Sequence, residues 1–264
     1  MEKNKIYNID CIEGMKQMIE RGILVDCILT SPPYNTETRN ASKYKGGNCY
    51  DNRYDTYEGN LSNDEYIKWT IELFNCFDKV LSPNGKVLYN LNYGSENTEC
   101  MNLTIAEILR NTNFTLADII VWEKSCALPQ NMSANKLTRV YEFIYVFVRR
   151  NEFMTFTTNK QAVGKHHGTQ VVYENIPNKI QARNNDEVCP YNFATFSTEL
   201  VYKLLNIYCK KGELIMDPFM GSGTTAVACY KKGLDFIGFE LSPKQVEWAN
   251  ERLEKIKQQI SIFE

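Results

Sequence analysis

The sequence lacks the features that would assign it to several broad classes of protein. Its 264 residues contain no apolar run near the roughly eighteen residues of a membrane span, and no basic segment followed by an apolar one as in an export signal. Its nine cysteines are scattered, with no C-x-x-C pair. That pattern is typical of reduced thiols and disfavours a structural zinc site. We therefore expect a cytoplasmic protein with no membrane association and no metal site.

An excess of one charge is also missing. The 30 Lys and Arg residues are balanced by 32 Asp and Glu residues, which gives a formal net charge of −2. The whole molecule therefore has no general attraction for nucleic acid, and any positive surface that binds DNA must be local. The two histidines, His166 and His167, are adjacent, and we interpret them as polar loop residues.

A pair of prolines follows directly after an apolar segment. Residues 25–30 have the pattern of a buried strand, and Ser31-Pro32-Pro33-Tyr34 come next. Each proline fixes φ and offers no amide hydrogen, and the residue before a proline is kept out of the helical region. The chain must leave the sheet in a stiff turn with a hydroxyl at its start and a ring at its end. Such a turn suits binding a planar group by its amine edge; a rigid connector with a packing tyrosine is equally consistent with these four residues.

A glycine-rich turn marks a second motif near the carboxyl end. The apolar run 213–216 leads to Asp217, the turn 218–223 follows, and a helix is predicted from Thr224. Glycines let the backbone approach a ligand, and a helix amino terminus favours a negative group. The next predicted strand, 235–239, ends at Glu240, in the place of the acid that binds ribose hydroxyls in nucleotide-binding βαβ units. This order predicts a nucleoside site.

The glycine pattern does not identify the nucleotide. Gly221, Gly223 and Ala226 also satisfy the loose dinucleotide fingerprint, so a nicotinamide-dependent oxidoreductase stays an alternative. Strand and helix patterns alternate at both ends of the chain, which predicts an α/β fold with a doubly wound, mostly parallel, Rossmann-like sheet. The predicted strands cover 5–10, 25–30, 86–91, 115–123, 141–148, 213–216 and 235–239, and the predicted helices cover 11–20, 62–81, 104–110, 224–230 and the segment after Ser242-Pro243.

The two motifs together resemble those of a known family. TSPPYN at 30–35 is similar to the catalytic motif, and DPFMGSGTTAVA at 217–228 to the S-adenosylmethionine motif, of the DNA amino-methyltransferases that modify N4 of cytosine or N6 of adenine. The catalytic motif comes first, as in the permuted (beta) group of that family. The resemblance implies a methyltransferase fold, S-adenosyl-L-methionine as cofactor and double-stranded DNA as partner. It also implies that the strand before Ser31 lies beside the strand before Asp217.

The resemblance also assigns roles to individual residues. The Ser31 hydroxyl and the Pro32 carbonyl would bind the amine of a flipped base, and Tyr34 would stack on that base. The implied catalytic residues are Ser31, Pro32, Pro33 and Tyr34. The implied cofactor-binding residues are Asp10, Cys11, Ser197, Asp217, Pro218, Phe219, Gly221, Gly223, Thr224 and Glu240.

Two irregular stretches are candidates for DNA recognition. Residues 36–59 mix cations with tyrosines and amides, and residues 125–191 carry further cations with little apolar periodicity. We predict that residues 1–124 and 192–264 form the catalytic domain and that 125–191 form an inserted target-recognition region; a solvated insertion that caps the sheet is the alternative. The predicted DNA contacts are Asn35, Arg39, Lys43, Lys45, Arg53, Arg139 and Lys165.

The target base is not fixed by these residues. In the resembled family a serine at the first motif position accompanies cytosine more often than adenine, so we expect N4-cytosine methylation, with N6-adenine methylation as the alternative. An RNA or protein-amide methyltransferase would keep both motifs, and a DNA-binding subunit without catalysis is a further alternative. The resemblance also suggests a restriction-modification system with a separate cognate endonuclease, and it is compatible with a homodimer.

Overall fold

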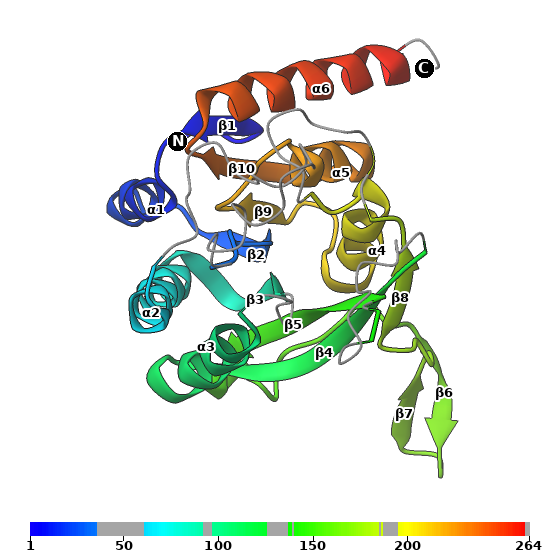
Figure 1. The fold of residues 1–264 in the computed structure, drawn as a ribbon. Helices are drawn as coiled ribbons and strands as arrows, with labels where there is room; N and C mark the ends of the chain where they lie inside the picture. The colour runs from blue at the N-terminus through cyan, green and yellow to red at the C-terminus, as the bar shows by residue number, and fades with distance from the viewer. Residues whose placement is uncertain are drawn as a thin grey trace.

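A central mixed sheet organises the protein. The computed structural model describes residues 1–35, 61–91, 97–125, 137–138, 140–184, 186 and 195–261, with side chains described to residue 259. Within these residues an eight-stranded sheet has the order β1-β10-β9-β2-β3-β5-β4-β8 (Figure 1). The elements are β1 (Lys5–Asn8), α1 (Cys11–Glu20), β2 (Val25–Thr30), α2 (Asn63–Val80), β3 (Leu81–Leu91), α3 (Thr98–Asn111), β4 (Phe114–Lys124), β5 (Tyr141–Arg149), the 3-10 turn η2 (Arg150–Glu152), β6 (Ala162–His166), β7 (Gln170–Tyr173), β8 (Lys179–Ala182), α4 (Thr198–Tyr208), β9 (Leu214–Asp217), α5 (Thr224–Lys232), β10 (Asp235–Glu240) and α6 (Pro243–Ser261).

Most of the sheet is parallel, which confirms the predicted fold class. The strands β1, β10, β9, β2 and β3 pair in parallel, as do β4 and β8, whereas β5 runs antiparallel to both β3 and β4. Parallel strands covered on both faces are mostly apolar, and all four residues of β9, including Asp217 at its end, are buried.

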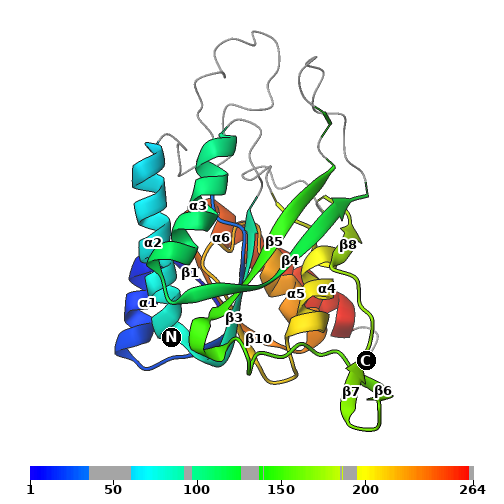
Figure 2. The same cartoon turned by 90° about the horizontal axis from the view of Figure 1, so that it is seen from below.

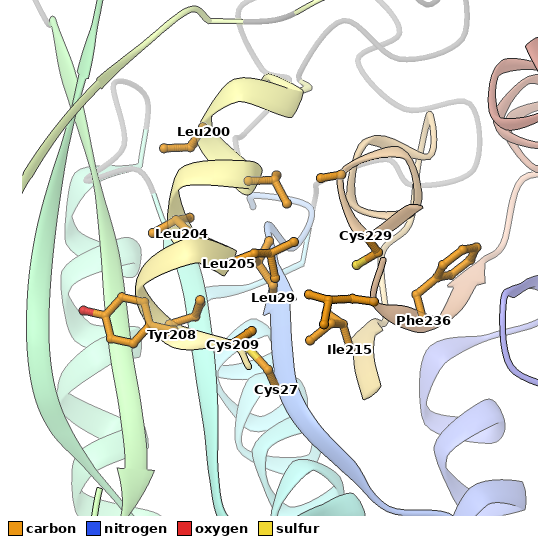
Figure 3. Packing of buried hydrophobic residues seen from close by; sticks show 14 of the residues in the cluster. Cys27, Leu29, Leu200, Leu204, Leu205, Tyr208, Cys209, Ile215, Cys229 and Phe236 are labelled. Carbon is orange, nitrogen blue, oxygen red and sulfur yellow. The ribbon is translucent and has the colours of Figure 1, made fainter. Parts of the chain in front are cut away.

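Helices cover both faces of the sheet (Figure 1). One core cluster packs residues of α1, α2 and α3 against the sheet, and the other packs residues of α4, α5 and α6 against the opposite face. Figure 3 shows Leu205 of α4 beside Leu29 of β2 and Ile215 of β9. The two strands that precede the sequence motifs therefore share one packed layer.

Local capping explains where several elements begin. Ser62 accepts from the amide of Glu65 while the Glu65 carboxylate accepts from the Ser62 amide, so α2 starts with a capping box. Asp10 caps α1 instead of extending β1, which ends at Asn8. The helix predicted over 104–110 begins earlier, at Thr98, because Asn97 provides the cap.

The segment 125–191 contributes to the central sheet as well as to a projection. Its strand β5 lies between β3 and β4, and β8 extends the sheet beyond β4. Between them, β6 and β7 form a separate two-stranded hairpin whose residues are all exposed. Figure 2 shows this hairpin projecting from the body of the molecule. None of the helices that the structure describes combines the length and the apolar character needed to cross a membrane.

Candidate active site

The two sequence motifs meet at one edge of the sheet. Cys27 and Ile28 of β2 pair with Ile215 and Met216 of β9, which are nearly two hundred residues away in sequence. Because parallel strands end at the same edge, the turn after β2 and the turn after β9 lie side by side. The predicted adjacency of these strands is confirmed.

Asp217 ties the two motifs together. Its Oδ1 accepts from the Thr30 hydroxyl at 2.7 Å and from the Phe219 amide at 3.0 Å, and its Oδ2 accepts from the Thr225 hydroxyl at 2.5 Å. Burial of the carboxyl raises the pKa of Asp217 to about 6, although these three hydrogen bonds each lower it. Asp217 thus joins the end of β2, the glycine-rich turn and the start of α5.

The glycine-rich turn has a backbone that only glycine adopts readily. Gly223 caps α5 with φ of 80°, and a Cβ placed there would lie 2.8 Å from the Cβ of Ala249. The amide of Gly221 donates to Glu240 Oε2 at 2.9 Å, and the amide of Ser242 donates to the other oxygen at 2.8 Å. Two backbone amides therefore fix the Glu240 carboxylate across from the turn.

A cavity of about 210 Å³ lies between the two motifs. It is lined by nine residues that we predicted: Asp10, Cys11, Ser31, Pro33, Pro218, Phe219, Gly221, Thr224 and Glu240. The remaining predicted catalytic and cofactor residues, Pro32, Tyr34, Ser197, Asp217 and Gly223, are not among the lining residues. Ser197 instead caps α4 through the amide of Leu200, next to Phe196, which does line the cavity.

Sequence reasoning missed several lining residues. The largest is Trp69 of α2, whose ring centroid lies 5.7 Å from that of Phe219. Its helical spacing gives no signal that separates it from an ordinary core position. Ile9 and Phe196 are adjacent to the predicted Asp10 and Ser197, and Met220 and Ser222 lie within the S-adenosylmethionine motif at 217–228. The remaining lining residues, which we did not predict, are Leu61, Thr195, Leu241 and Gln245.

The proline turn is held by side chains from neighbouring elements. The Tyr66 hydroxyl of α2 donates to the Pro33 carbonyl at 3.1 Å. Ser31 Oγ and the Tyr34 hydroxyl lie 3.2 Å apart. Asn35, which we predicted as a DNA contact, is instead fully buried, and its amide donates to the Leu61 carbonyl at 2.7 Å. Its side chain therefore supports the turn from inside the protein.

Of the other six predicted DNA contacts, Lys165 is the one that lies within the described residues, and it is far from this cavity along the sheet. Lys165 lies on β6, in the projecting hairpin. The chain reaches that hairpin from the carboxyl end of β5, where Val148 pairs with Lys86, and so from the edge of the sheet opposite to the cavity. Five predicted contacts lie outside the described residues: Arg39, Lys43, Lys45, Arg53 and Arg139. Within the described ranges, no group of three or more metal-ligating side chains is arranged to hold an ion.

Comparison with known proteins identifies the family. A family model described as DNA methylase, which covers N6 and N4 methyltransferases, matches residues 25–251. The chain belongs to this DNA methylase family. The resemblance inferred from the two motifs is confirmed.

Curated relatives include type II methyltransferases. M.Cfr9I of Citrobacter freundii is 28% identical over 57% of this chain and 48% of its own length, so the chain spans about half of that protein. M.HinfI of Haemophilus influenzae is 23% identical over 96% of this chain and 69% of its own length.

Solved structures share the fold. The PvuII DNA methyltransferase, described as cytosine-N4-specific, has a TM-score of 0.67 at 18% identity, and the match covers 96% of this chain and 89% of that one. A complex of M1.HpyAVI with S-adenosylmethionine has a TM-score of 0.64 at 22% identity, covering 94% of this chain and 98% of that one.

Proposed function

We propose that this protein transfers a methyl group from S-adenosylmethionine to the exocyclic amine of a flipped base in duplex DNA. The observation that carries this proposal is that both motifs line one cavity. Ser31 and Pro33 of the first motif line it together with Phe219 and Gly221 of the second motif and with Glu240. A donor bound against the second motif and Glu240 would share this cavity with an amine bound against the first motif.

The residues of the cavity suit the cofactor. The fixed Glu240 carboxylate is an acceptor for ribose hydroxyls, as in other nucleotide-binding βαβ units. The rings of Trp69 and Phe219 and the aliphatic Leu241 provide an apolar surface for an adenine ring. When bound, the cofactor supplies an electrophilic methyl group on a sulfonium centre.

The proline turn would prepare the amine. The lone pair of an exocyclic amine is delocalised into the base and is a poor nucleophile. Hydrogen bonds from the amine to Ser31 Oγ and the Pro32 carbonyl would draw the nitrogen toward tetrahedral geometry, and Tyr34 would hold the ring. Alignment of this kind can supply on the order of 7–11 kcal/mol of the barrier. Base flipping is required because the amine cannot be reached inside a duplex.

N4 of cytosine is the proposed target, and N6 of adenine is the alternative. The serine at position 31 supports cytosine through the tendency of the family, since aspartate at that position usually accompanies adenine. Type II relatives further support a role in restriction-modification. Residues 36–59 and 125–191 are proposed to contribute to recognition of the target sequence.

Transfer of tritium from labelled S-adenosylmethionine tests the proposal. Duplex DNA should be labelled, whereas RNA and protein should not, and nucleoside mass spectrometry should identify N4-methylcytosine. Labelling of RNA or protein alone would overturn the proposal, and N6-methyladenine in the DNA would replace cytosine with the alternative base. Binding of NAD in preference to S-adenosylmethionine would revive the oxidoreductase interpretation.

A further inference from the structure

A line of polar side chains leads from the proline turn into the interior of the sheet. The Tyr34 hydroxyl donates to Asn90 Oδ1 at 3.3 Å. Asn90 Nδ2 donates to Glu142 Oε2 at 3.3 Å and to the Phe143 carbonyl at 3.0 Å. Glu142 Oε1 accepts from Lys124 Nζ at 2.5 Å. The line crosses three neighbouring strands, β3, β5 and β4, and begins one hydrogen bond away from Ser31.

The far end of this line fixes the orientation of Asn90. Its amide group faces the carboxylate of Glu142 and a backbone carbonyl, both of which accept hydrogen bonds. The opposite orientation would place the amide oxygen against those two acceptors and would cost two hydrogen bonds at a position that is only 5% exposed. Asn90 must therefore present its oxygen to Tyr34.

This orientation determines which hydroxyl donates at the near end. A tyrosine carries one hydroxyl hydrogen, and Tyr34 gives it to Asn90. In the contact between Tyr34 and Ser31 the hydrogen must then come from Ser31. With its only hydrogen committed, Ser31 Oγ can meet a substrate only as an acceptor.

We propose that Asn90 and Glu142 are positioning residues that set Ser31 as a hydrogen-bond acceptor for the target amine. This inference rests on the proposed function and adds to it the groups that control the catalytic hydroxyl. An amine offers hydrogens, and accepting one draws its lone pair out of the ring. A Ser31 that donated to the neighbouring ring nitrogen would instead withdraw electron density from the base. The buried polar line thus selects the productive orientation.

The charge of Lys124 has a defined part in this arrangement. Glu142 is only 7% exposed, and burying a carboxylate without a partner is costly. Lys124 is that partner and also lies over the ring of Trp122 at 5.1 Å from the centroid. A second lysine–carboxylate pair, Lys86 with Glu213 at 2.8 Å, is also largely buried. Lys86 lies on β3, four residues before Asn90. The Lys86–Glu213 pair therefore provides a matched control outside the line.

The test compares steady-state methylation by the full-length protein carrying Asn90→Leu, Glu142→Gln or Glu213→Gln. In Glu142→Gln the new amide can donate to Asn90, which allows Asn90 to turn and donate to Tyr34. We expect kcat to fall roughly ten- to hundredfold in Asn90→Leu and Glu142→Gln, the range typical of groups that orient a ligating or reacting residue. Affinity for S-adenosylmethionine, measured by calorimetry, should change by less than about threefold. Glu213→Gln should keep kcat even if it lowers the melting temperature.

A double-mutant cycle separates positioning from general damage. If Asn90 acts through the tyrosine hydroxyl, Asn90→Leu should cost little in a Tyr34→Phe background. Additive losses, unchanged kcat in Glu142→Gln, or an equal loss of kcat in Glu213→Gln would each overturn the inference. Glu142→Gln keeps the test decisive if Asn90→Leu does not fold. Failure of the wild-type protein to methylate DNA would instead refute the proposed function.

Discussion

Thr30 and Asp217 join the two motifs by a hydrogen bond of 2.7 Å between completely buried side chains. Thr30 is the last residue of β2 and precedes Ser31, while Asp217 is the last residue of β9 and precedes the glycine-rich turn. The bond therefore sets the distance between the turn that would bind the amine and the turn that would bind the donor.

Replacing Thr30 with valine should disturb both folding and catalysis. The substitution keeps the shape but removes one of the two donors to the buried Asp217 Oδ1, which costs roughly 1–3 kcal/mol in the free energy of unfolding. We expect kcat to fall as well, because Ser31 follows directly. Urea unfolding and tritium transfer measure the two effects. Thr104→Val, which removes a buried hydroxyl donating to the Cys100 carbonyl in α3, is the control and should keep kcat. An equal loss of kcat in both variants would contradict this role of Thr30.

The titration of Asp217 should make stability depend on pH. Burial raises its pKa from 3.8 to about 6, so the folded state holds this proton more tightly than the unfolded state does. Its contribution to stability is therefore largest below pH 3.8 and is lost as the pH rises through 6. Relative to Asp217→Asn, the wild-type free energy of unfolding should fall by up to about 3 kcal/mol across this window. Urea unfolding of both proteins at a series of pH values measures the free energy of unfolding of the wild type minus that of Asp217→Asn. If this value rose with pH instead of falling, the predicted direction would be wrong.

Ser31→Ala should separate turnover from cofactor binding. The hydroxyl would touch the amine, so its loss should lower kcat by on the order of 100-fold, as for other positioned transition-state groups. Affinity for S-adenosylmethionine should change little. Asp217→Ala should weaken the affinity for S-adenosylmethionine far more than it lowers kcat, because it loosens the glycine-rich turn and α5. Single-turnover methylation and calorimetric titration distinguish the two. Comparable losses of both quantities in Ser31→Ala would argue against its contact with the amine.

Gly223→Ala should weaken cofactor binding and stability together. The residue has φ of 80°, and its new Cβ would lie 2.8 Å from Ala249 Cβ, so the turn and α6 must move apart. Gly22→Ala is the matched control, since Gly22 has φ of 64° and a Cβ added there would meet nothing within 4 Å. Thermal unfolding should show a loss of about 1 kcal/mol for the control and a larger one for Gly223→Ala. Equal losses would mean that the close approach to Ala249 contributes nothing.

The parts that could be predicted from the sequence are those where single residues determine the local backbone conformation. Prolines 32 and 33 and the glycines of 221–223 restrict or free the backbone locally, so their turns are visible in the chain itself. Alternating strand and helix patterns likewise predicted the parallel sheet. Residues 25–30 and 213–217 contain no local signal of their pairing, which the resemblance alone implied.

Other features depend on tertiary pairing that no short pattern reveals. Asn90 and Glu142 meet only because β3 and β5 are antiparallel in one register. Trp69 lines the cavity, although its spacing in α2 does not distinguish it from a core position. The charge of Lys165 is evident in the sequence, but the end of the molecule on which it lies follows from the direction of β5.

Trp69 gives the protein an intrinsic optical reporter. The chain has three tryptophans, and Trp69 is the one among the residues lining the cavity, beside Phe219. Trp122 is buried in the core cluster that packs against α4, α5 and α6. Trp248 belongs to α6. A protein with phenylalanine at 122 and 248 would emit from a single indole at the cavity wall. Occupancy could then be followed by fluorescence in real time, without a label on the ligand or on the DNA.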